Sequence, residues 1–184
     1  SAQDCMEIFI GKTVRSEAAR IEARTGKPLT DAWMAAFYKR RNVRLEAELQ
    51  AIDGALDAVA AVHARLGGRI ACASGADRYK VEMQLQKVGL APYFAGRVFS
   101  GHEMPATKPA PDVYLAAAAA LGVPPQRCLV VEDTVTGVTA GVAAGATVVG
   151  FSPSPVGHGS PEALRAAGAV QVLAHLRELP ALLG

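Results

Sequence analysis

The chain has 184 residues, of which 51% are apolar and 20% charged, so it is long and apolar enough to fold around its own core. This composition excludes a disordered chain, and the net charge of +2 argues against nucleic acid or an anionic membrane as the main partner. The sequence has no apolar run of 18 residues, so we expect no membrane-spanning helix. Its three cysteines lie far apart, which favours a reducing, cytoplasmic setting over a disulfide framework or a zinc site.

The first 50 residues have a helical pattern without a clear strand. Apolar residues recur at roughly helical spacing over 31–49, and a shorter helix is expected over 16–24. Thr30 or Asp31 is suited to cap the longer helix.

From residue 51 onward, short apolar runs alternate with helical segments. Strands are expected near 69–74, 97–100, 128–131 and 146–151, with a possible edge strand at 170–172. Helices are expected over 55–66, 77–88 and 112–121, from 132 to 144, and again near the C-terminus. This alternation predicts an α/β fold with a doubly wound, Rossmann-like parallel sheet that is covered on both faces.

Ligands of such sheets bind beyond the carboxyl ends of the strands, so the residues at those ends matter most. Ser74-Gly75 follows one strand, and its hydroxyl and amide suit a phosphoryl oxygen, although a serine there also suits a helix cap. Lys108 lies in a segment stiffened by two prolines before a helix, where it offers a fixed positive charge or is simply solvated.

Glu132 and Asp133 follow the most apolar strand. Paired carboxylates are typical ligands of Mg²⁺, whereas the alternative is that one of them merely caps the next helix. Ser74, Lys108 and the acidic pair together predict a pocket for a phosphate group and Mg²⁺, which suits phosphoryl transfer.

These motifs resemble the haloacid dehalogenase-like superfamily, in particular its phosphatase and β-phosphoglucomutase branch. Ala73-Ser74-Gly75 is similar to the second family motif, the segment 108–111 followed by Tyr114 to the third, and the segment 130–134 with its downstream glycines to the fourth. The resemblance implies that Ser74 and Gly75 bind the phosphoryl group, that Lys108 offsets negative charge, and that Glu132 and Asp133 hold Mg²⁺. It also implies a partial helical cap over 1–50 and a catalytic core over 51–184.

The first family motif, Asp-x-Asp-Gly-Thr at the end of a strand, is missing from these 184 residues. In the family its first Asp attacks phosphorus and its second acts as general acid and base. That strand lies between the strands ending at Ser74 and Glu132, so we expect a gap in the sheet and a nucleophile supplied upstream of Ser1. The chain alone is then expected to be inactive.

The resemblance implies a Mg²⁺-dependent phosphomonoester hydrolase that acts on a small phosphorylated metabolite through an aspartyl phosphate. Two alternatives remain open, namely a sugar-phosphate mutase of the same family and a non-catalytic fragment that binds a phosphate ligand or a partner. Lys12, Arg15 and Arg78 are candidates to grip the rest of the substrate, although each is also explained as a surface charge. Neither the particular substrate nor the oligomeric state follows from the sequence.

Overall fold

A computed structural model describes residues 14–153 and 159–183. All described strands belong to parallel pairs, and helices alternate with them, which confirms the predicted α/β class. In chain order the elements are α2 (Ala18–Thr25), α3 (Asp31–Glu48), α4 (Ala55–Arg65), β1 (Cys72–Ser74), α5 (Arg78–Lys87), η1 (Ala91–Phe94), β2 (Val98–Ser100), η2 (Gly101–Glu103), α6 (Asp112–Leu121), η3 (Pro125–Arg127), β3 (Leu129–Glu132), α7 (Val135–Ala143), β4 (Thr147–Phe151), α8 (Pro161–Ala166), β5 (Gln171–Leu173) and η4 (Leu176–Leu183).

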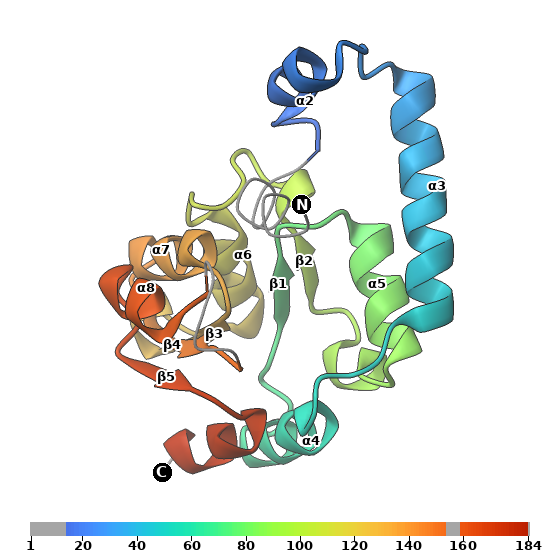
Figure 1. Ribbon diagram of the computed structural model, residues 1–184. Helices are drawn as coiled ribbons and strands as arrows, with labels where there is room; N and C mark the ends of the chain where they lie inside the picture. The colour runs from blue at the N-terminus through green and yellow to red at the C-terminus, as the bar shows by residue number, and fades with distance from the viewer. Residues whose placement is uncertain (1–13, 154–158, 184) are drawn as a thin grey trace.

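The strands form two separate sheets. One consists of β1 and β2, the other of β3, β4 and β5 in that order, and among the described residues no ladder joins β1 to β3. Figure 1 shows the two sheets as distinct groups of arrows. The break falls between the strands that end at Ser74 and Glu132, where the sequence predicted the gap.

The predicted elements match the observed ones within a few residues, with one difference in type. The C-terminal segment, expected to be helical, is the 3₁₀-helix η4 and not an α-helix like the other predicted helices. Pro180 lies inside it and has no backbone N–H to donate, which disfavours a continuous α-helix.

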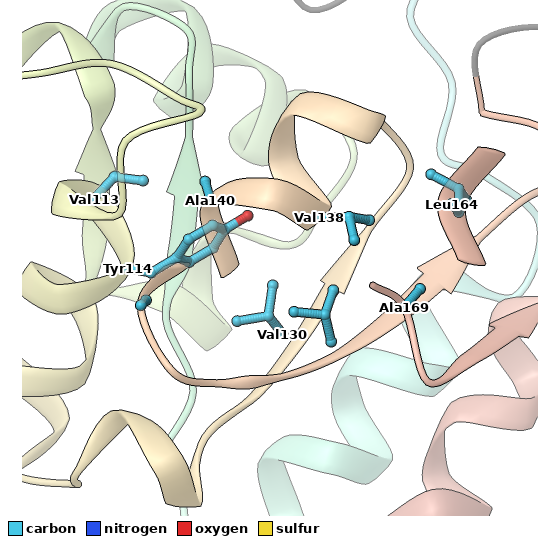
Figure 2. Packing of buried hydrophobic residues seen from close by; sticks show 9 residues of the cluster. Val113, Tyr114, Val130, Val138, Ala140, Leu164 and Ala169 are labelled. Carbon is cyan, nitrogen blue, oxygen red and sulfur yellow. The ribbon is translucent and has the colours of Figure 1, made fainter. Parts of the chain in front are cut away.

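A cluster of buried apolar residues fixes β3 and β4 against α6, α7 and α8. Its members, several of which Figure 2 shows, come from all of these elements. Small residues on α7 let the helix approach the sheet closely, since a side chain at Gly141 would overlap Val148 of β4. The cluster consists of Val113, Tyr114, Val130, Val138, Ala140, Ala144, Val148, Leu164 and Ala169.

Residues 14–50 contain two helices and, as far as they are described, no strand. Helix α3 lies alongside α5 (Figure 1), and Arg41 Nη2 lies 3.2 Å from Asp77 Oδ2 across this contact. Asp77 also caps α5, because its Oδ1 accepts the Lys80 amide at 2.9 Å. Among the described residues, no helix has the length and hydropathy needed to cross a lipid bilayer.

The double role of Asp77 gives a testable prediction. Partial burial opposes its ionisation, but the Lys80 amide and the Arg41 guanidinium outweigh this and hold the pKa of Asp77 below its ordinary value. At neutral pH, Asp77→Asn is expected to cost about 0.2–1 kcal/mol of unfolding free energy for the lost ion pair. Asp77→Ala also removes the cap, which adds about 0.5–2 kcal/mol.

Urea titrations at several pH values test this. A carboxyl group with a lowered pKa stabilises the fold above its unfolded pKa, about 3.9, and loses that effect as the pH falls through the folded-state pKa. The difference between wild type and Asp77→Asn should therefore disappear in acid. A difference that is independent of pH would contradict the ion-pair contribution.

Candidate active site

Lys108 is the centre of a polar cluster between the two sheets. Its Nζ lies 2.5 Å from Glu132 Oε1 and donates to the Tyr114 hydroxyl at 2.8 Å and to the Ala73 carbonyl at 3.2 Å. The side chains of Lys108 and Glu132 are only 11% and 10% exposed. Lys108 thus connects the C-terminal end of β1 with that of β3, which brings together two of the predicted strand ends.

Local sequence explains how each group reaches this cluster. Lys108 precedes Pro109 and Pro111, and Lys108–Pro109 is a cis peptide. Helix α6 begins at Asp112, two residues before Tyr114. Glu132 ends β3, and the Thr134 hydroxyl donates to its Oε2 at 3.2 Å while also capping α7 by accepting the Gly137 amide at 3.0 Å.

Tyr114 and Thr134 have contacts that sequence reasoning did not assign. The Tyr114 hydroxyl donates to Glu132 Oε1, and burial together with the Glu132 charge raises the pKa of Tyr114 well above its ordinary value. It is therefore a neutral donor near pH 7. The signals in the sequence are its place in the third family motif and its position six residues after Lys108, on the first turn of a helix.

Ser74 ends β1, and its Oγ accepts the Ala76 amide at 3.1 Å. The cap of the following helix is Asp77, so the alternative of a serine helix cap is not what the structure shows. Gly75 is exposed, and its backbone lies against Gly101, where an added Cβ would meet the Gly75 Cα at 3.4 Å. The hydroxyl and this loop lie next to Ala73, whose carbonyl contacts Lys108.

Asp133 is exposed as a residue, yet its carboxyl group is partly desolvated and lies near the Glu132 charge. Desolvation and Glu132, in that order, raise the pKa of Asp133. Because the charged form of Asp133 is disfavoured, a nearby cation would stabilise it. Glu132, by contrast, already accepts hydrogen bonds from Lys108, Tyr114 and Thr134. The donors therefore fit a hard cation such as Mg²⁺ held mainly by Asp133. In the part of the chain that is described, no group of three His, Cys, Asp or Glu side chains is arranged to hold a metal by itself.

Two of the candidates for substrate contacts form ion pairs with other residues. Arg78 forms a two-point ion pair with Glu103, with both N–O distances 2.6 Å, and contacts Glu82 at 3.2 Å. Arg15 pairs with Asp31 at 3.1 Å on the exposed surface. Lys12 lies outside the described residues. Within residues 14–153 and 159–183, no hydrogen bond or ion pair joins Arg15 or Arg78 to the cluster around Lys108, so their roles remain predictions.

Comparison with known proteins identifies the family of the chain. A model of the haloacid dehalogenase-like hydrolase family matches residues 3–145. The chain is 31% identical to 6-phosphogluconate phosphatase of Escherichia coli over 79% of its own length and 62% of that enzyme. It spans less than two thirds of the length of this and the other first curated relatives.

Solved structures show the same fold. A haloacid dehalogenase-like protein of unknown function from Agrobacterium tumefaciens superposes with a TM-score of 0.80 at 33% identity, over 100% of this chain and 82% of that one. A family hydrolase from Deinococcus radiodurans with bound phosphate and sodium gives 0.78 at 29% identity, over 100% and 80% of the two chains. With the family model matched over most of its length, the chain belongs to the haloacid dehalogenase-like hydrolases.

Proposed function

We propose that this chain provides the phosphate- and Mg²⁺-binding part of a phosphomonoester hydrolase that acts on a small phosphorylated metabolite. The observation that carries this proposal is the contact of Lys108 with both strand ends, beside Ser74 on one side and Asp133 on the other. The likeness to 6-phosphogluconate phosphatase over most of the chain supports a sugar-phosphate substrate and favours a phosphatase over a mutase.

Each residue has a distinct part in the proposed reaction. The Ser74 hydroxyl and the Gly75 amide bind phosphoryl oxygens, and Lys108 offsets the charge that develops on them. Asp133 holds Mg²⁺, which supplies further charge neutralisation when bound, and Glu132 orients Lys108 next to it. Residues 1–50 act as a partial cap over this site, and 51–184 form the catalytic core.

The proposed reaction also requires a nucleophile that attacks phosphorus. The reaction proceeds through an aspartyl phosphate, with the nucleophile supplied by an Asp-x-Asp segment that these 184 residues do not contain.

The absence of this motif also favours a second candidate, a chain that binds phosphate ligands without turnover. An assay of phosphate release from 6-phosphogluconate distinguishes them. We expect turnover only after an apolar strand ending in Asp-x-Asp-Gly is fused to the N-terminus, and a fused protein without turnover would favour the second candidate.

Binding of Mg²⁺ is testable on the chain alone. A ligand at 100 times its Kd stabilises a protein by about 2.7 kcal/mol, and each kcal/mol raises the Tm of a chain this size by about 2–4 °C. We therefore expect saturating Mg²⁺ to raise the Tm of wild type by roughly 5–10 °C and to leave that of Asp133→Asn unchanged. The increase should shrink as the pH falls, because protons compete for a carboxyl group whose pKa is raised.

Asp57→Asn is the matched control, since it removes an exposed carboxylate on α4, away from the strand ends. It should keep the full response to Mg²⁺. A full response in Asp133→Asn would instead show that the metal binds elsewhere.

A further inference from the structure

Ser100, at the end of β2, is a buried polar residue that has no part in the reaction proposed above. Its side chain is fully buried, and its Oγ accepts the His102 amide at 3.2 Å, which caps η2. The same hydroxyl donates to the Ala76 carbonyl at 2.7 Å. A hydroxyl has one proton to donate, so this contact uses the whole donor capacity of Ser100. It joins the end of β2 to the segment that follows β1.

Ala76 links this contact to Ser74. The Ala76 carbonyl accepts from Ser100, and the Ala76 amide donates to Ser74 Oγ at 3.1 Å. Because that second bond uses a lone pair of Oγ, the O–H of Ser74 can still donate to a phosphoryl oxygen. Successive hydrogen bonds in such a chain polarise and strengthen one another. The orientation of the Ser74 hydroxyl therefore depends on Ser100 through the backbone of Ala76.

Two other contacts join the same segments, but each constrains them less than the hydroxyl of Ser100. Gly101 packs against the segment after β1, where an added Cβ would meet backbone atoms at 3.4 Å, which limits the distance but sets no direction. Arg78 and Glu103 pair at two points, yet their side chains are 41% and 42% exposed, and exposed ion pairs hold their geometry weakly. The bond from Ser100 is buried and directional, and its loss would leave a carbonyl without that donor.

We propose that Ser100 is a positioning residue that holds the segment 74–76 in the conformation that receives the phosphoryl group. It acts through the backbone of Ala76 and does not touch the reacting atoms. The inference rests on the proposed function, since it assumes that Ser74 and Gly75 bind phosphate. Without the hydroxyl, the segment has to be ordered when phosphate binds, and ordering the backbone of one residue is worth about tenfold in affinity.

Titration of the intact chain with inorganic phosphate in saturating Mg²⁺, followed by NMR, tests this proposal. We expect Ser100→Ala to raise the Kd for phosphate about tenfold. Ser100→Cys keeps the approximate size of the side chain but donates only weakly, so it should bind phosphate as poorly as Ser100→Ala. Binding by Ser100→Cys as tight as that of wild type would overturn the proposal, because packing and not the donated hydrogen bond would then be decisive.

Leu173→Val is the matched control for stability. It shortens a fully buried side chain of β5, in the other sheet, so it destabilises the fold away from the segment 74–76. It should bind phosphate as tightly as wild type. A Kd raised as much as in Ser100→Ala would overturn the proposal, because a general loss of stability would then explain both variants.

Amide hydrogen exchange of the phosphate-free chain separates this inference from the proposed function. The Ala76 amide, which donates to Ser74, should exchange about tenfold faster in Ser100→Ala than in wild type. Unchanged exchange at Ala76 would overturn the positioning role, whatever the affinity for phosphate. If wild type binds no phosphate, the proposed function fails, while faster exchange in Ser100→Ala would still support the ordering of this segment by Ser100.

Discussion

Replacement of Lys108 by methionine is expected to lower the free energy of unfolding by about 3–5 kcal/mol. The substitution keeps the length of the side chain but leaves the carboxylate of Glu132, which is 10% exposed, without its cation. Removing one partner of a buried ion pair lowers the free energy of unfolding by much more than the intact pair contributes, because the remaining charge stays desolvated. Urea denaturation at pH 7 measures the change.

Two further variants identify the cause. Lys108→Met combined with Glu132→Gln should recover most of the loss, since no buried charge then remains. Lys39→Met removes a lysine from the exposed surface of α3 and should change stability by no more than about 0.5 kcal/mol. If the double variant were as unstable as Lys108→Met, the loss would come from packing and not from the buried charge of Glu132.

The meeting of Lys108 and Glu132 could be predicted from the sequence because it depends on chain topology. Short apolar strands alternating with helices require parallel pairing, and parallel pairing places the residues that follow each strand at one edge. This is why Lys108 and Glu132, 24 residues apart, meet in the structure. The gap between β1 and β3 was likewise expected, although from the family resemblance and not from periodicity.

The contacts of individual side chains could not be predicted from the sequence, because they depend on rotamers and on partners distant in sequence. Arg78 remains a candidate for substrate contacts, but its two-point pairing with Glu103, 25 residues away, was not predicted. The binding of metal by Glu132 stays a prediction, and the sequence did not predict that both of its carboxyl oxygens accept hydrogen bonds from Lys108, Tyr114 and Thr134. Hydrophobic patterning determines which strand carries a residue but not which polar partner meets it.

Gly137→Ala is expected to lower the free energy of unfolding by about 2–4 kcal/mol, even though alanine favours a helix over glycine by about 1 kcal/mol. Gly137 lies buried on the first turn of α7, and a Cβ there would overlap the carboxyl group of Glu132. A flexible side chain ordinarily moves aside at little cost. Glu132 is held by Lys108 and Tyr114, so its displacement breaks the buried ion pair.

The sign of the effect should reverse when Glu132 is truncated. In a Glu132→Ala background, the carboxyl atoms that a Cβ at position 137 would overlap are gone. Gly137→Ala should then stabilise the protein by up to about 1 kcal/mol through helix propensity. Urea denaturation of the four proteins in this double-mutant cycle gives the coupling energy directly. A coupling near zero would mean that Glu132 moves freely, and the close approach of α7 would then have no part in holding Lys108 between the two sheets.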